Sequence, residues 1–100
     1  MGAPSTDKSA IRQIVTANVE SGCELKFVDN GGDWDENVEV STITEAVKEV
    51  CEVDEASLVV EGPSGERAFV YFVLGNSPEE VGADWSASLD EVLMSVIRNW

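Results

Sequence analysis

Residues 67–74 constrain the fold more than any other part of the sequence. They read Arg-Ala-Phe-Val-Tyr-Phe-Val-Leu and are apolar on both faces of an extended chain. In a small sheet this pattern is typical of a central strand, or of a strand whose second face is covered by a loop or a partner subunit. Residues 58–61 predict its hairpin partner, joined through the turn sequence Gly-Pro-Ser-Gly at 62–65.

Three segments have apolar residues at helical spacing, namely residues 5–21, residues 43–51 and a segment that begins near Ser88. Thr42 with Glu45, and Ser88 with Glu91, have the spacing of capping boxes, and Gly22 favours the end of the first helix. The apolar stripes are Ile11, Ile14, Val15 and Val19; Ile43, Ala46, Val47, Val50 and Cys51; and Leu89, Val92, Leu93, Val96, Ile97 and Trp100.

The remaining segments complete the predicted fold. Residues 23–28 alternate as a strand with one buried face does, and residues 36–40 favour a short return strand. Residues 77–80 predict one helical turn at most, because Gly82 follows. The expected fold class is α+β, with a three- or four-stranded antiparallel sheet and three helices packed mainly on one face. We expect residues 1–100 to form one domain, with residues 1–4 as a loose end.

The charge is strongly negative, with 20 Asp and Glu against 6 Lys and Arg, no His, and a net charge of −14. Residues 20–61 hold thirteen acids against Lys26 and Lys48 only, a net of −11. A hydrophobic fraction of 43% is nevertheless high enough for a folded chain. Such a surface repels phosphate backbones and anionic membranes and attracts basic partners. We therefore expect a basic protein partner, with no direct nucleic acid and no membrane.

Catalysis, metals and cofactors find little support in the sequence. Without histidine, Ser and Cys lack the usual base, so a carboxylate mechanism is the only enzymatic route left and no enzyme is expected. Two cysteines cannot supply a zinc site. A calcium-loop pattern begins at Asp33, but Val38 stands where Gly is needed and Thr44 where Glu is needed. We expect no metal and no cofactor.

The cysteines and the apolar segments of the sequence indicate the cellular compartment of the protein. Cys23 alternates with Leu25, and Cys51 continues a helical stripe, so both are predicted to be buried free thiols, with a Cys23–Cys51 bridge as the alternative. No apolar run reaches the roughly 18 residues of a membrane span, and the first residues lack a secretion signal. The expected location is the cytoplasm.

The first functional hypothesis is a non-catalytic binder whose acidic face occupies a basic, nucleic-acid-binding type of surface on a partner. The candidate partner-binding residues are Asp33, Trp34, Asp35, Glu36 and Glu39 in the predicted hairpin, and Glu45, Glu49, Glu52 and Asp54 on and after the second helix. In composition, as a small acidic chain without histidine, the protein resembles the DNA-mimic inhibitors of phages and mobile elements, including anti-restriction and anti-CRISPR proteins. That resemblance implies an inhibitory role.

Two alternatives stay open. In the first alternative, the acidity is an adaptation to a high-salt cytoplasm. This alternative predicts a coat of carboxylates, spread over the whole surface rather than gathered in one patch. In the second, which is compatible with either of the others, the chain forms a homodimer through the apolar strand at residues 69–74 or through an exposed helix stripe. The clustering of acids in residues 20–61 favours the patch over the coat. Trp34, between Asp33 and Asp35, and Trp85, beside Asp84, are each either a contact for a partner cation or an anchor that closes the end of the sheet.

Overall fold

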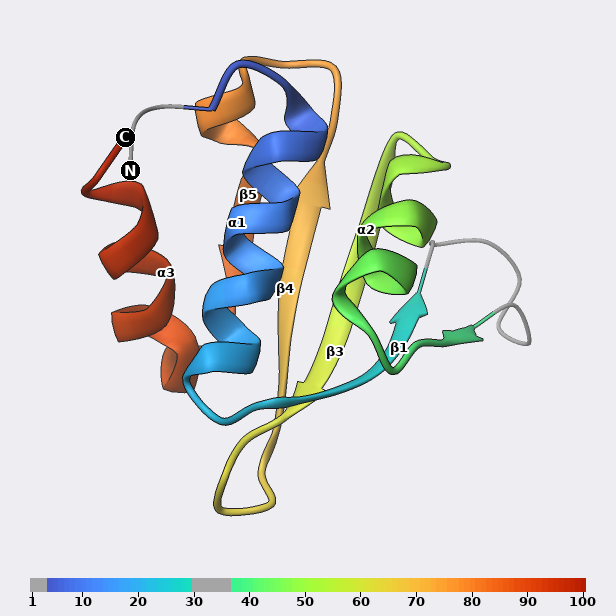
Figure 1. Ribbon diagram of the computed structural model, residues 1–100, viewed down its shortest axis with the longest axis vertical. Helices are drawn as coiled ribbons and strands as arrows, with labels where there is room; N and C mark the ends of the chain where they lie inside the picture. Colours follow the sequence, from blue (N-terminus) through green and yellow to red (C-terminus); the bar gives the residue numbers. More distant parts are fainter. Residues whose placement is uncertain (1–3, 30–36) are drawn as a thin grey trace.

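The computed structural model describes residues 4–29 and 37–100, which form an α+β fold of three helices and one five-stranded sheet (Figure 1). In chain order the elements are α1 (Asp7–Glu20), β1 (Glu24–Asp29), β2 (Val38–Glu39), α2 (Ile43–Cys51), β3 (Glu55–Glu61), β4 (Arg67–Val73), the 3₁₀ turn η1 (Pro78–Glu80), β5 (Gly82–Trp85), the 3₁₀ turn η2 (Ala87–Leu89) and α3 (Asp90–Ile97). The predicted class and helix number are confirmed within these residues, whereas the sheet exceeds the predicted three or four strands.

The sheet has the strand order β2-β1-β3-β4-β5, and each neighbouring pair is antiparallel. β4 therefore has hydrogen-bonded neighbours on both sides, as its two apolar faces predicted. The predicted hairpin of β3 and β4 pairs along its whole length without a register shift. In the turn between these strands, the Gly62 N–H donates a hydrogen bond to the Glu66 carbonyl at 2.7 Å. Gly65 has a φ of +86°, a backbone conformation that favours glycine.

The strand that the sequence did not predict is β5, which pairs with β4 on the side away from β3. The single turn expected at residues 77–80 is present as η1, and β5 follows it closely. Its first three residues, Gly82, Ala83 and Asp84, have low β propensity, so the local sequence does not predict a strand. A Cβ at Gly82 would lie 3.2 Å from Ile14 Cδ1 of α1. Close packing of the helix thus explains the glycine.

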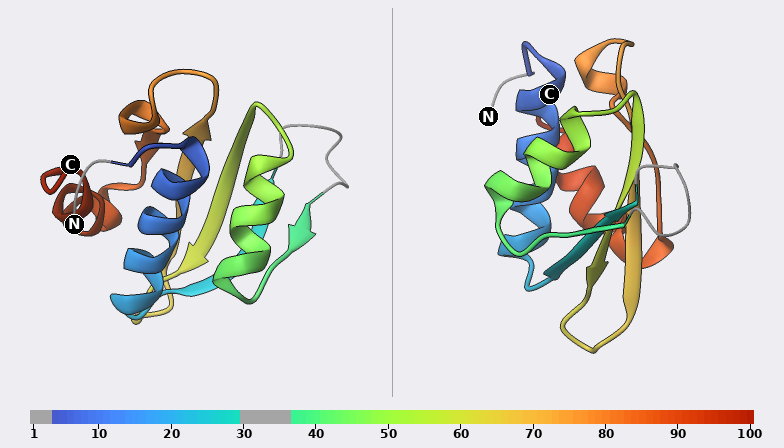
Figure 2. Two further views of the ribbon diagram at one scale, coloured as in Figure 1. Left: turned by 45° about the horizontal axis from the view of Figure 1, so that its top comes forward. Right: turned by 90° about the vertical axis from the view of Figure 1, so that its right-hand side faces the viewer.

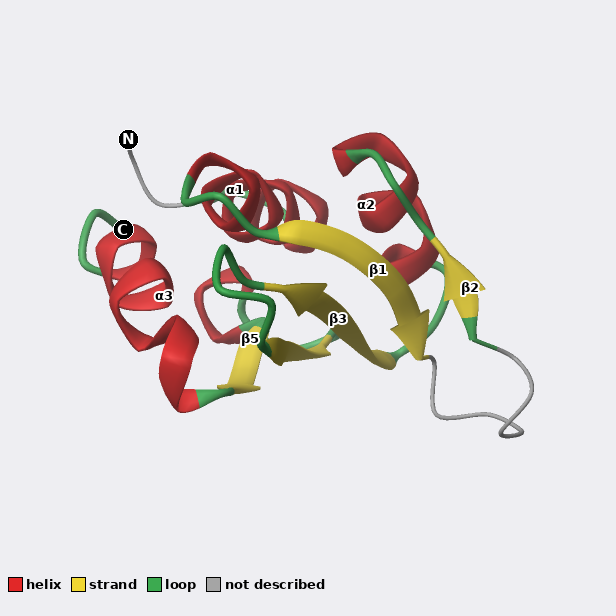
Figure 3. Cartoon of the chain, turned by 90° about the horizontal axis from the view of Figure 1, so that it is seen from below, coloured by secondary structure: helices red, strands yellow, loops and turns green. Residues whose placement is uncertain are grey.

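The helices gather on one face of the sheet. α1 and α2 lie side by side over it, and α3 packs against α1 next to β5 (Figures 2 and 3). In β3 the side chains of Ala56, Leu58 and Val60 are buried under the helices, and the residues between them face the other way. The largest fully buried side chains include Phe72, Ile11, Ile14, Leu58 and Leu93. The core therefore lies between one helical layer and one face of the sheet.

α1 begins and ends close to the predicted positions, but its buried stripe differs by one residue. Thr6 caps the first turn with its side chain, and Gly22, with a φ of +98°, follows the last. The Val19 side chain, predicted to face the core, is 37% exposed, whereas Asn18 is fully buried. The Asn18 amide Nδ2 donates a hydrogen bond to the Ile14 carbonyl at 2.9 Å, and this bond replaces one that the buried amide nitrogen would otherwise form with water.

α3 begins later than predicted, and the capping box of Ser88 and Glu91 is wrong. Ser88 lies in η2, Leu89 occupies the N-cap position, and no side chain caps the helix. The reason lies one turn earlier, where Ser86 exchanges hydrogen bonds with Phe69 of β4. Its Oγ accepts from the Phe69 N–H at 2.9 Å, and its own N–H donates to the Phe69 carbonyl at 3.0 Å. These bonds attach the start of this segment to the sheet.

Two tryptophans connect the C-terminal segment to the rest of the fold. Trp85 packs against the core, and its Nε1 donates to Asp90 Oδ1 at 3.2 Å, which joins the end of β5 to the first turn of α3. Trp100 also packs against the core, as its place in the helical stripe predicted, and its Nε1 donates to Gln13 Oε1 of α1 at 2.8 Å. At the other end Pro4 is buried, while residues 1–3 of the predicted loose end lie outside the described residues.

Candidate interaction surfaces

The structure describes five of the nine residues predicted to bind a partner. The other four, Asp33, Trp34, Asp35 and Glu36, lie outside the described residues. They are also the first four positions of the calcium-loop pattern. The described ones are Glu39 in β2, Glu45 and Glu49 in α2, Glu52 at its C-cap and Asp54 before β3. Four of these therefore lie on or beside one helix, while the fifth belongs to the sheet.

Glu45, Glu49 and Glu52 lie on one side of α2, because positions i, i+4 and i+7 share a helix face. The opposite side of the helix is apolar and packs on the sheet. The carboxylates of Glu49, Glu52 and Asp54 form no ion pair or hydrogen bond with a described residue. This stripe is the predicted acidic face of the second helix.

Glu45 differs from its neighbours because its carboxylate is used by the helix itself. Oε1 accepts hydrogen bonds from the Ser41 N–H at 3.3 Å, from the Ser41 hydroxyl at 3.1 Å and from the Thr42 hydroxyl at 3.2 Å. In return, Thr42 Oγ1 accepts from the Glu45 N–H at 3.1 Å, so the predicted capping box is confirmed. The hydrogen bonds from Ser41 and then Thr42 lower the pKa of the Glu45 carboxyl. Of the three carboxylates in the stripe, that of Glu45 is therefore the least available to a partner.

The acids of residues 20–61 that the structure describes lie on both layers of the fold rather than on one element. Residues 20–61 run from the end of α1 through β1, β2 and α2 to the end of β3, and so pass through both layers of the fold. Glu39 pairs with Phe27 across β1 and β2, on the sheet, whereas Glu49 lies on α2. The described carboxylates therefore occur on the helical layer and on the sheet alike.

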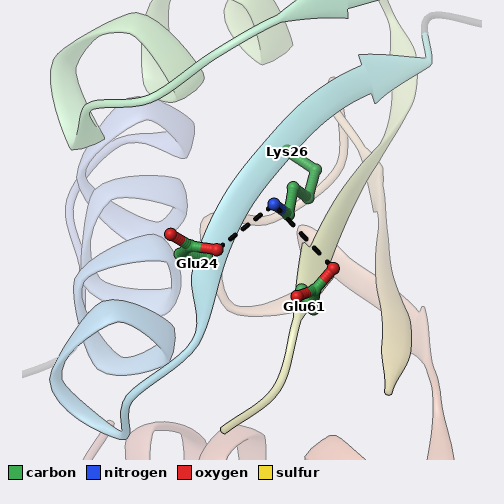
Figure 4. A network of polar contacts seen from close by, with 3 residues as sticks. All are labelled: Glu24, Lys26 and Glu61. Atoms are coloured by element: carbon green, nitrogen blue, oxygen red, sulfur yellow. Dashed lines mark ion pairs between the residues drawn. The ribbon is translucent and has the colours of Figure 1, made fainter. Parts of the chain in front are cut away.

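One basic residue of the sheet is fully engaged. Lys26 Nζ lies 3.2 Å from Glu24 Oε2 and 3.8 Å from Glu61 Oε2 (Figure 4). Glu24 and Glu61 are directly paired across β1 and β3, where two like charges repel. A register shift between Leu25 and Phe27 sets Lys26 in the irregular part of β1, and its ammonium offsets this repulsion.

The face of the sheet opposite the helices, here the open face, carries an apolar row of Phe27, Val59 and Phe69. Phe27 pairs with Val59 across β1 and β3, and Val59 pairs with Phe69 across β3 and β4, so the three stand side by side. Phe69 is 37% exposed, and the other two are half-buried. The Arg67 guanidinium lies 5.8 Å from the centre of the Phe27 ring, within reach of a cation–π interaction.

Polar and charged residues frame the apolar row. Tyr71 stands in the next row, where it pairs with Ser57 of β3 and Asp84 of β5. Its Oη donates to Glu55 Oε2 at 2.8 Å, and this hydrogen bond is the main reason that the pKa of Tyr71 is raised. By strand register, the described acids of the open face are Glu24, Asp29, Glu39, Glu55, Glu61 and Asp84, against the basic Lys26 and Arg67.

Sequence reasoning named only part of the apolar row, because residues 69–74 were a candidate dimer surface whereas Phe27 and Val59 were not named as a site. The signal was present, since residues 23–28 alternate and residues 67–74 are apolar on both faces. What the sequence does not contain is the strand order, which brings residues 27, 59 and 69 together. The partner-binding candidates, which were acids and the neighbouring Trp34, therefore did not include the aromatic centre of this face.

A groove of about 380 Å³ between α1 and α2 collects half of the basic residues of the chain. Its lining includes Lys8, Arg12 and Lys48, beside Cys51 and Glu52. None of the three cations forms an ion pair with a residue in the part of the chain that the structure describes. Burial raises the pKa of the Cys51 thiol, and the nearby Lys8 opposes this effect. One side of the acidic stripe on α2 is therefore bordered by positive charge.

Both cysteines are free thiols, as predicted, with Cys23 buried and Cys51 half-buried. Within residues 4–29 and 37–100, no group of three or more His, Cys, Asp or Glu side chains could hold a metal ion. Nor does any helix in these ranges have the length and apolar character needed to cross a membrane.

Comparison of the chain with protein-family models, with curated protein sequences and with solved structures finds no match. Its class is therefore defined by the fold and the surface alone. It is an acidic α+β protein with a five-stranded antiparallel sheet, whose helices gather on one face and whose other face combines aromatic side chains with carboxylates.

Proposed function

We propose that this chain is a non-catalytic, cytoplasmic binding protein whose carboxylates occupy a basic surface of a partner protein. One observation carries the proposal. The carboxylates of Glu39, Glu49, Glu52 and Asp54 are engaged in no ion pair or hydrogen bond with a described residue. The fold does not use these charges, so a partner's Lys and Arg side chains can meet them without first breaking an internal contact.

The partner surface in this proposal is one that otherwise binds nucleic acid, and the chain acts as an inhibitor by excluding it. Duplex DNA presents a phosphate about every 3.4 Å along each strand, and a basic surface that binds it must hold several cations close together. A helix that carries a carboxylate on each turn of about 5.4 Å offers a comparable series of negative charges. The compositional resemblance to DNA-mimic inhibitors supports the same role.

A second candidate function is favoured by the placement of the acids. Carboxylates lie on the helical layer and on the sheet, as the coat of a protein adapted to a high-salt cytoplasm would. Under this alternative the charge keeps the protein hydrated and has no dedicated partner. The two candidates differ in whether duplex DNA competes for what the protein binds.

The test is retention on the immobilised protein at physiological ionic strength, followed by elution with duplex DNA. We expect basic proteins to be retained and then released by duplex DNA, because both ligands need the same cationic surface. A dextran of equal concentration serves as the uncharged control for the elution. Retention of no basic protein, or retention that duplex DNA does not reverse, would count against the proposal and in favour of salt adaptation.

A further inference from the structure

We infer that the partner docks on the open face of the sheet, and that it is a basic protein segment with an apolar side chain between its Lys or Arg residues. This inference rests on the proposed function, because it names the surface and the chemistry of the same partner. It differs from simple phosphate mimicry, since part of the contact is apolar.

The acidic stripe of α2 is the competing surface, and its surroundings are less suitable. The carboxylate of Glu45 is held by Ser41 and Thr42 at the start of the helix. The groove beside the stripe is lined by Lys8, Arg12 and Lys48. A basic partner that approaches α2 would meet these three cations at short range, where salt screens them little.

The centre of the open face is apolar and accessible. Phe69 is 37% exposed, while its neighbours Val70 and Phe72, which face the helices, are fully buried. Phe27 and Val59 continue the same row on β1 and β3. Aromatic side chains in the middle of a surface, enclosed by polar groups, are the usual anchors of protein interfaces. The apolar row therefore offers a partner more than electrostatic contact.

The frame of this row is negative. Six described acids share the open face with two basic residues, and both of those are engaged. Lys26 lies between Glu24 and Glu61, and Arg67 lies over the Phe27 ring. Glu39 pairs directly with Phe27, next to the apolar row. Some of these acids also have internal contacts, since Glu24 and Glu61 hold Lys26 and Glu55 accepts from Tyr71, but the acids outnumber the basic residues and the face stays net negative, which complements Lys and Arg.

The same charges argue against a second copy of this chain as the occupant. Two copies packed through their open faces would place the six acids of one against the six acids of the other, with only four basic residues between them. Like charges brought together across an interface oppose association. A basic partner removes this repulsion, whereas a homodimer increases it.

The experiment compares two peptide probes on the ¹⁵N-labelled full chain. One peptide alternates lysine and leucine, and the other is oligolysine with the same number of lysines. We expect the lysine–leucine peptide to bind about tenfold more tightly, as a single interface anchor typically provides. We also expect the largest amide shift changes in β1, β3 and β4, around Phe27, Val59 and Phe69.

A pair of matched variants separates the open face from the helical layer. Phe69→Ser should weaken the lysine–leucine peptide about tenfold and leave oligolysine unchanged. Val19→Ser is the control, because Val19 is also 37% exposed but lies on α1. Circular dichroism would show whether each variant is folded. If a variant does not fold, the map of amide shift changes in the unaltered protein still locates the peptide.

The outcomes distinguish this inference from the proposed function. Equal affinities for the two peptides, with shifts on α2 around Glu49 and Glu52, overturn the docking surface but leave the proposed function standing. Absence of binding to either peptide at physiological ionic strength overturns both. Concentration-dependent shifts of the apolar row without peptide show a second copy there, and also overturn the inference.

Discussion

The Tyr71 hydroxyl donates a hydrogen bond to Glu55 Oε2 at 2.8 Å, between β4 and β3 on the open face of the sheet. Tyr71 is the only tyrosine of the chain, so its ionisation can be followed without interference from another phenol. The acceptor stabilises the protonated phenol, and the pKa of Tyr71 is therefore raised from its ordinary value of 10.0. This pair makes the state of the open face measurable by absorbance.

Replacing the acceptor, in Glu55→Gln, should lower the ionisation midpoint of Tyr71 toward its ordinary value of 10.0. Because the pKa is raised in the folded state, the linked stabilisation is present below pH 10 and is lost as the pH rises through the folded-state pKa. Absorbance of tyrosinate against pH measures the midpoint. Identical midpoints in Glu55→Gln and in the unaltered protein would contradict the hydrogen bond.

The capping carboxylate predicts a pH-dependent stability. Hydrogen bonds from Ser41 and Thr42 lower the pKa of Glu45 below its ordinary value of 4.5, so their contribution is present above that pH. It is lost as the pH falls through the lower folded-state pKa. Glu45→Gln should therefore melt at a lower temperature than the unaltered protein at pH 7, and the difference should shrink in acid. In the control Glu79→Gln, a similar pH-dependent difference would show that the effect is not specific to the cap.

Two adjacent valines of β3 test whether one face of the sheet is covered and the other is open. Val60 is fully buried under the helices, and Val59 belongs to the apolar row on the opposite face. Val60→Ala should lower the free energy of unfolding by about 2 kcal/mol, as buried large-to-small substitutions do. Val59→Ala should cost less than about 1 kcal/mol. Denaturant unfolding measures both, and equal losses would mean that the open face is also packed.

The thiols should react slowly in the native protein. Burial raises the pKa of Cys51 and so reduces its thiolate fraction, while Lys8 acts in the opposite direction. Cys23 is buried against the core. A disulfide reagent near neutral pH should thus modify both thiols slowly before unfolding and rapidly after it. Lys8→Gln should slow the reaction of Cys51 further, and Lys26→Gln is the control. Rapid modification of either thiol in the folded chain would contradict this environment.

Periodic segments were sufficient to predict α1, α2 and the β3–β4 hairpin, because each buries one regular apolar face. They were not sufficient where tertiary contacts decide the structure. β5 forms by pairing with β4 although three of its four residues have low β propensity, and Gly82 admits the side chain of Ile14. The start of α3 depends on the hydrogen bonds between Ser86 and Phe69, which are 17 residues apart.

The candidate surface was less predictable than the fold. Charge counting found the acids but could not show that Glu45 is used by its own helix, or that Glu39 and Glu49 belong to different layers. It also could not find the apolar row, because Phe27 and Phe69 become neighbours of Val59 only through the strand order. The spatial register, rather than composition, defines the open face.

The central claim is that the carboxylates serve a partner rather than a saline cytoplasm. The most direct test is the thermal unfolding of the chain, followed by circular dichroism, in dilute buffer and in molar KCl. At that salt concentration the Debye length is about 3 Å, so repulsion between surface carboxylates is largely screened. Our account predicts a folded protein with one cooperative transition in both solutions. A chain that is unfolded in dilute buffer and folds only in KCl would contradict it, because its acidity would then be an adaptation to salt.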